Sequence, residues 1–153
     1  MKVIVAAVGK PRNAVLAAAI EHYETRAARY WPLDIREVRE ESARATPPDM
    51  VRTKEGERLA ARIEGASVVA CDERGISMTS SAFTNFLQSA RERAKDLAFV
   101  IGGAYGLADS VRDRAQTRLA LAPWTLPHEL ARLVLAEQLY RAGTIARGEP
   151  YHK

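Results

Sequence analysis

The sequence predicts an α/β domain in which a mainly parallel sheet is flanked by helices. Short apolar runs alternate with longer amphipathic segments along the chain of 153 residues, as in successive β-α units. Several of the short runs are apolar at consecutive positions, which is typical of strands covered on both faces. Because the chain shows no repeat, linker or low-complexity tract, we expect residues 1–153 to form a single domain.

Five short runs are the predicted strands. The first is β-branched and closes at Gly9 and Pro11, residues that disfavour a strand interior. The third is followed by the segment Asp72–Gly75, which we interpret as a turn. The expected strands are Lys2–Val8, Leu33–Val38, Ser67–Cys71, Leu97–Ile101 and Arg118–Leu121.

Helical periodicity and capping residues define the longer segments. Asn13 can cap the first helix, and Thr125 can cap the last one, where Pro127 suits the first turn. A loop at 42–49 precedes the second helix. The expected helices run from Asn13 to about Tyr30, from Asp49 to Ile63, from Ser80 or Ser81 to about Lys95, from Asp109 to Ala115 and from about Pro127 to Arg147.

Composition excludes several classes of protein. With 47% hydrophobic and 27% charged residues, the chain is neither disordered nor built for a membrane. Cys71 is the only cysteine, so no intrachain disulfide can form, and a reducing cytoplasm is the simplest location. The net charge of +4 weakly favours an anionic partner, but acids are interleaved with the arginines, and an ordinary solvated surface explains the charge equally well.

Two loops at predicted strand ends are candidate ligand sites. In "FVIGGAYGL", Phe99–Leu107, a buried strand runs into glycines, which serve either a tight turn or a close approach of backbone to a ligand. The spacing is not that of a dinucleotide or Walker loop. In "LALAPWTLPHE", Leu119–Glu129, an apolar loop carries Trp124, which suits either core packing or a flat heterocycle such as adenine.

The last predicted helix is apolar around much of its circumference, so we expect it to pack on its own sheet and on a second subunit. Glu137 and Arg141 are spaced i,i+4 on one stripe, where they can fix an interface or aim the arginine at an anion. The tail "GEPYHK" is either frayed or part of a site. We expect His22 at the surface and His128 in a structural role, and no metal or hydrolytic constellation is apparent.

These segments closely resemble a bacterial enzyme family. The resemblance is carried by "MKVIVAAVGK", "KEGERL", "FVIGGAYGL", "LPHELARLVLAEQLYRA" and "IARGEPYHK", and it runs essentially from end to end. The family is the ribosomal large subunit methyltransferase H family of the SPOUT superfamily. The resemblance implies a SPOUT-type fold with a C-terminal trefoil knot, S-adenosylmethionine as methyl donor, a homodimer, and a 23S rRNA pseudouridine methylated at N(3). A chain of this length has little surface for a free RNA helix, so we expect it to act on the assembled ribosome, where shape supplies specificity.

The resemblance also implies roles for particular residues. A leucine is usual in the family where Cys71 stands, and a serine and a smaller residue are usual at Pro123 and Trp124. Apolar surroundings make Cys71 an unsuitable nucleophile, because they raise the pKa of a thiol. The positions implied to bind the donor are Cys71, Gly102, Leu121, Ala122, Pro123, Trp124, Thr125 and Leu126.

The tail and the last helix supply the residues expected to act on the RNA base. We assign His152 as a base or positioning group, Tyr151 as a stacking surface and Arg141 as a catalytic cation, serving their own subunit's pocket or the partner's. RNA contacts are expected from Arg132, Arg141 and Lys153. The alternatives are a non-catalytic ribosome- or RNA-binding module with this fold, and a SPOUT enzyme that acts on tRNA.

Overall fold

The computed structural model describes residues 1–153 and confirms the α/β class. All five strands lie in one parallel sheet with the order β2-β1-β4-β3-β5. The strands are β1 (Val3–Val8), β2 (Leu33–Val38), β3 (Ser67–Ser77), β4 (Leu97–Ile101) and β5 (Thr117–Ala120). The helices are α1 (Ala14–Ala27), α2 (Pro48–Ala60), α3 (Ser80–Glu92), α4 (Asp109–Arg114) and α5 (His128–Ala146).

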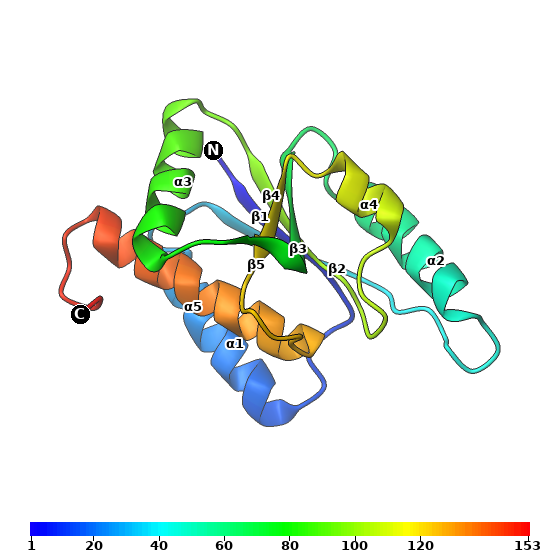
Figure 1. The fold of residues 1–153 in the computed structure, drawn as a ribbon. Helices are drawn as coiled ribbons and strands as arrows, with labels where there is room; N and C mark the ends of the chain where they lie inside the picture. Colours follow the sequence, from blue (N-terminus) through cyan, green and yellow to red (C-terminus); the bar gives the residue numbers. More distant parts are fainter.

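The sheet is the middle of three layers, with α1, α3 and α5 on one face and α2 and α4 on the other (Figure 1). Alternate residues of a strand point to opposite faces, so each buried strand contributes to two cores. In β1, Val3 and Val5 pack in the core under α1, α3 and α5, whereas Ile4 packs in the core under α2 and α4. This double burial explains why the strands are apolar at consecutive positions.

The first helix begins as its sequence predicts. The side-chain oxygen of Asn13 accepts hydrogen bonds from the backbone N–H groups of Val15 and Leu16, both at 3.0 Å. These two groups have no partner within the helix, so the asparagine satisfies them and fixes where α1 starts. None of the helices combines the length and the apolar character that crossing a membrane requires.

The predicted turn at Asp72–Gly75 is wrong. The chain continues as β3 to Ser77, and Cys71 and Ile76 both align with Leu119 of β5, so the intervening residues form a bulge. A Cβ on Gly75 would lie 2.5 Å from the backbone of Arg118, so only glycine allows the two strands to approach at this point. The turn-forming residues that suggested a break instead make a bulge.

The arrangement of β3, β4 and β5 prepares a site at one edge of the sheet. The three strands are neighbours and parallel, so the segments at 71–74, 102–107 and 121–127 lie near one another. Ligands in open α/β sheets bind at this edge, beyond the carboxyl ends of the strands.

Candidate functional site

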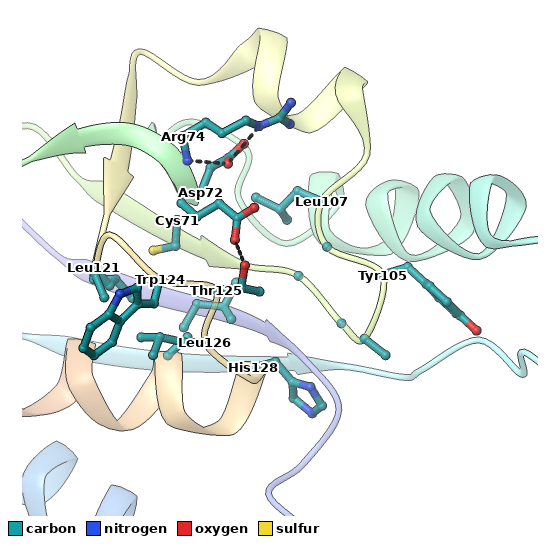
Figure 2. Close-up of a pocket in the computed structure, with 18 of the residues that line it drawn as sticks. Cys71, Asp72, Arg74, Tyr105, Leu107, Leu121, Trp124, Thr125, Leu126 and His128 are labelled. Carbon is teal, nitrogen blue, oxygen red and sulfur yellow. Dashed lines mark hydrogen bonds and ion pairs between the residues drawn. The ribbon is translucent and has the colours of Figure 1, made fainter.

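A cavity of about 350 Å³ opens where these three segments meet. Residues 71–74 of β3 form one wall, the glycine loop at 101–107 forms a second, and the loop at 121–126 with the start of α5 forms the third (Figure 2). A cavity of this size suits a small organic ligand or a cofactor. It is the candidate ligand site.

The glycine loop presents bare backbone to this cavity. A Cβ on Gly102 would lie 2.5 Å from the backbone carbon of Gly106, a distance that no side chain tolerates. Gly106 has φ +80°, in the left-handed region that favours glycine, and its N–H donates to the carbonyl oxygen of Gly103 at 3.0 Å. The loop is therefore a tight turn and a smooth wall at once, so the two sequence interpretations are compatible.

The residues expected to bind a donor gather around the cavity, with one exception. Pro123 is exposed and does not line it, whereas Trp124 lies at its mouth with 78% of its surface exposed. The indole therefore does not pack in the core, which removes the core-packing interpretation of this loop. The predicted residues that line the cavity are Cys71, Gly102, Leu121, Ala122, Trp124, Thr125 and Leu126.

Thr125 does not cap α5 as predicted. Its hydroxyl donates to the carboxylate of Glu73, and the N-cap position is Pro127, which makes no side-chain cap (Figure 2). The hydrogen bond joins the loop after β5 to the bulge of β3. It fixes the two walls of the cavity relative to each other.

Four charged residues of the cavity wall are absent from the predicted site, because three of them lie in the segment predicted as a turn. They are Asp72, Glu73, Arg74 and Arg112. The backbone N–H of Arg74 donates to Oδ1 of Asp72 at 3.0 Å, and Nε of Arg112 lies 2.9 Å from Oδ2. Burial raises the pKa of the Asp72 carboxyl, but the hydrogen bond and the two guanidinium charges outweigh it, so the pKa lies below its usual value. Asp72 is therefore ionised at neutral pH.

Two further lining residues differ in how well the sequence anticipates them. Burial raises the pKa of the Cys71 thiol to about 12, which agrees with the apolar surroundings expected for it and makes it a poor nucleophile. His128 lines the cavity, although the sequence suggested only a structural role. No group of three or more His, Cys, Asp and Glu side chains is placed to hold a metal ion.

The residues assigned to catalysis form a second cluster at the far end of α5. The guanidinium of Arg141 donates through Nε to Oε1 of Glu137 at 2.9 Å, and its Nη1 lies 3.3 Å from Nδ1 of His152. The same guanidinium lies 4.8 Å from the ring centroid of Tyr151. The structure therefore brings Arg141, Tyr151 and His152 together, with Glu137 between them. We call these four residues the tail cluster.

The tail cluster does not line the cavity of its own chain. Ala131 is the last residue of α5 that lines the cavity, and the guanidinium-bearing Arg141 of the cluster lies 10 residues further along the helix. At 1.5 Å per residue their separation along the axis is roughly 15 Å. In Figure 1 the carboxyl end of α5 and the tail lie away from the loops that precede the helix.

The structure argues against an RNA contact by Arg132. This side chain is only 6% exposed, and its Nε donates to Oε1 of Glu24 at 2.7 Å, joining α5 to α1. A buried guanidinium with carboxylate partners is occupied within the protein and presents no charge to a polyanion. Lys153, by contrast, is exposed.

Comparisons with known proteins identify the family. A family model described as "Predicted SPOUT methyltransferase" matches residues 1–152. "Ribosomal RNA large subunit methyltransferase H" of Gemmatimonas aurantiaca is 60% identical, with 100% of both chains covered. The chain belongs to the ribosomal RNA large subunit methyltransferase H family of SPOUT methyltransferases. The protein of the same name from Anaeromyxobacter dehalogenans is 47% identical over 100% of both chains.

Solved structures agree on the SPOUT fold at low sequence identity. A probable methylase family protein from Haemophilus influenzae aligns with a TM-score of 0.57 and 10% identity, covering 99% of this methyltransferase and 70% of that chain. A tRNA (m1G37) methyltransferase from Aquifex aeolicus aligns with a TM-score of 0.55 and 9% identity, covering 92% of the present chain and 70% of that chain. At such identities the likeness concerns the fold alone.

Proposed function

We propose that this SPOUT methyltransferase transfers a methyl group from S-adenosylmethionine to N(3) of pseudouridine 1915 of 23S rRNA, as a cytoplasmic homodimer acting on the assembled ribosome. The observation that carries the proposal is full-length identity of 60% to a relative named for methylation of large-subunit ribosomal RNA. The cavity and the tail cluster supply the two parts that such a reaction needs.

The cavity fits the donor on three counts. Its volume of about 350 Å³ falls in the range of small-molecule sites. The glycine loop offers backbone polar groups with no side chain in the way, and the indole of Trp124 offers a flat face at the mouth. S-adenosylmethionine supplies, when bound, a methyl group on a positively charged sulfur that leaves readily to a nucleophile.

The tail cluster provides groups suited to the RNA base that accepts the methyl group. A uracil-type N(3) carries a proton at neutral pH, so a group that accepts this proton or stabilises the resulting anion is required. His152 provides an imidazole whose ring nitrogen can accept a proton, and Arg141 provides a permanent positive charge. Glu137 holds Arg141 in place, so the cation needs little reorganisation when the base arrives.

The distance between the cavity and Arg141 of the tail cluster, roughly 15 Å along α5, favours a shared site in a dimer. A tail cluster set apart from the cavity of its own chain can serve the cavity of a second copy, if two-fold symmetry sets the α5 helices against each other. Each active site then combines the cavity of one subunit with the tail cluster of the other.

The trefoil knot is part of the same proposal. His128 and Ala131 at the start of α5 line the cavity together with the glycine loop and the loop at 121–126. This arrangement supports a terminal helix that enters between the two loops. An experimental map with continuous density from the glycine loop to the end of α5 tests the threading.

Mass spectrometry of 23S rRNA from a strain that lacks the gene tests the proposed reaction. We expect one methyl group to be missing from a single pseudouridine and to return with the wild-type gene. A gene that lacks the codons for Tyr151–Lys153 should not restore it, although its product should still bind the donor and form dimers. An unchanged 23S rRNA together with a missing methyl on tRNA would favour the tRNA enzyme, and the absence of any donor binding would favour the non-catalytic module.

Mixed dimers test the shared site. Ala122→Trp should fill the cavity, and deletion of Tyr151–Lys153 removes the tail, so each variant alone should be inactive. In a mixture, half of the dimers combine the two chains and carry one complete site of two, so about a quarter of the wild-type activity should return. Activity that does not return on mixing would mean that each tail serves its own chain.

A further inference from the structure

In the cavity wall, the guanidinium of Arg112 is held by two carboxylates and keeps one nitrogen without a partner. Nε of Arg112 lies 2.9 Å from Oδ2 of Asp72, and Nη1 donates to Oδ1 of Asp109 at 2.7 Å. The remaining nitrogen, Nη2, makes no hydrogen bond or ion pair. It faces the glycine loop, because a Cβ on Gly106 would lie 3.9 Å from it.

The surroundings make this arginine rigid. Its side chain is 18% exposed, and it projects from α4, which is anchored in the core by the neighbouring Val111. Asp72 is also fixed, since it accepts the backbone N–H of Arg74 and is itself only 8% exposed. A planar guanidinium held on two sides is pre-organised for a third contact in the same plane.

The other positively charged residues of the cavity are less suitable for recognition. The side chain of Arg74 is 69% exposed and lies 3.5 Å from Asp72, so it is at the rim and well solvated. His128 carries an imidazole, which cannot offer a carboxylate the forked pair of N–H groups that a guanidinium offers. Arg112 is thus the one fixed cation whose free nitrogen points toward the backbone wall.

From this geometry we propose that Arg112 binds the carboxylate of the amino-acid portion of the methyl donor, and that Asp72 positions Arg112 for that contact. The inference rests on the proposed function, since it assigns a part of the proposed donor to a part of the cavity. A carboxylate is the group that a guanidinium recognises best, and the adenine and ribose of the donor offer no other anion. Arg112 therefore selects donors and products that carry the whole amino acid.

Binding measurements with a graded set of ligands test this assignment. The set is S-adenosylmethionine, S-adenosylhomocysteine, decarboxylated S-adenosylmethionine and 5′-methylthioadenosine, titrated calorimetrically into the wild type, Arg112→Met, Arg112→Lys and the matched rim variant Arg74→Met. For the wild type we expect the carboxylate-bearing ligands to bind roughly 10- to 100-fold more tightly than the decarboxylated one, as for a charge-assisted hydrogen bond.

The variants separate recognition from support of the fold. Arg112→Met should lose the preference for a carboxylate and keep the affinity for 5′-methylthioadenosine within about twofold, Arg112→Lys should keep part of the preference, and Arg74→Met should keep all of it. An equal loss for every ligand in Arg112→Met would show a merely structural role and overturn the inference. The inference would also be overturned if the wild type showed no preference for carboxylate-bearing ligands, or if Arg74→Met lost that preference. A wild type that binds none of the four ligands would overturn the proposed function itself.

Discussion

The hydroxyl of Tyr151 donates a hydrogen bond of 3.0 Å to Oε1 of Glu137, tying the tail to the middle of α5. The same oxygen accepts Nε of Arg141 at 2.9 Å, and the Tyr151 ring packs on Tyr140 with their centroids 4.6 Å apart. Burial and the hydrogen bonds with Tyr23 and Glu137 raise the pKa of Tyr151, so its hydroxyl stays protonated and remains a donor at neutral pH. Tyr151 is therefore held against α5 through both its hydroxyl and its ring.

Two substitutions at Tyr151 distinguish its ring from its hydroxyl. Tyr151→Phe loses the hydrogen bond to Glu137 but keeps the surface on which Arg141 lies, so we expect a reduction of methyl transfer of only about threefold. Tyr151→Ala also removes the support of Arg141 and should reduce transfer by about 100-fold or more. Single-turnover methylation of ribosomes that lack this methyl group measures both effects.

The control for these two variants is affinity for the methyl donor. Arg141, which lies on the Tyr151 ring, is roughly 15 Å along α5 from Ala131 of the cavity, so donor affinity should stay within about threefold unless the partner's tail also touches the donor. Equal losses of transfer in Tyr151→Phe and Tyr151→Ala would show that the hydroxyl matters and that support of the guanidinium by the ring does not.

Cys71 should react very slowly in the folded protein. With a pKa of about 12, only about one thiol in ten thousand is ionised at pH 8, and the thiolate is the reactive form. Because Cys71 is the only cysteine, the reaction with a chromogenic disulfide reports on this position alone. We expect the native protein to react at least 100-fold more slowly than the protein in guanidinium chloride, and S-adenosylmethionine to slow it further. A native rate close to that of free glutathione would contradict the burial of the thiol.

Glu55 on α2 should make stability depend on pH. It is 4% exposed, its Oε1 accepts the backbone N–H of Glu41 at 3.1 Å, and its Oε2 has no hydrogen-bond partner. Burial is the main cause that raises the pKa of this carboxyl, helped by the negative charges of Glu40 and Glu41 and opposed by the Glu41 N–H and Arg58. The folded state therefore holds this proton more tightly than the unfolded state, whose pKa is about 4.3.

The direction of the effect follows from proton binding. As pH rises from about 4.3 through the raised pKa of the folded protein, Glu55 costs an increasing amount of stability, about 1.4 kcal/mol for each pKa unit between the two states. Glu55→Gln keeps an oxygen for the Glu41 N–H and cannot ionise, so its stability relative to the wild type should increase from pH 4 to pH 8. Urea unfolding at several pH values measures this change, with the exposed Glu57→Gln as control. Parallel profiles of wild type and Glu55→Gln would contradict the prediction.

The sequence predicted the layers of this fold well, because burial leaves a strong pattern. Strands covered on both faces are apolar throughout, and Asn13 marks the start of α1 by satisfying free N–H groups. The sequence failed where a tertiary contact overrides a local preference. The residues Asp72–Gly75 have turn chemistry, yet pairing with β5 converts them into a bulge.

The candidate site was predicted in its backbone parts and missed in its charged parts. The glycine loop and the indole-bearing loop are each a single stretch of sequence that directly follows a predicted strand, so both can be recognised from local sequence. The Asp72–Arg112 pair joins β3 to α4 across the fold, so no local pattern reveals it. Arg132 shows the opposite error, a charged residue wrongly placed in the site. Its charge suggested an RNA contact, and only the packing of α5 on α1 reveals that Glu24 is its carboxylate partner.

Trp124 should report donor binding through its fluorescence. The protein has two tryptophans, and Trp31 is fully buried, with its Nε1 donating to the carbonyl oxygen of Leu139 at 2.8 Å. Trp124 is 78% exposed at the mouth of the cavity, so it alone is accessible to a ligand there and to the quencher acrylamide. Adding S-adenosylhomocysteine should shift the emission and protect one tryptophan from acrylamide. Both effects should vanish in Trp124→Phe, which retains Trp31.

The contribution of the Trp124 indole to ligand affinity can be measured with S-adenosylhomocysteine. Stacking of a base on an aromatic side chain contributes about 1–3 kcal/mol, so Trp124→Ala should weaken binding by roughly fivefold or more, and Trp124→Phe by less. Free methionine, which lacks the adenine, should leave the emission of the wild type unchanged and serves as the control. A spectral change that persists in Trp124→Phe would have to come from Trp31 in the core. It would contradict the placement of the adenine against this loop, because the fully buried indole of Trp31 touches α5 and not the cavity.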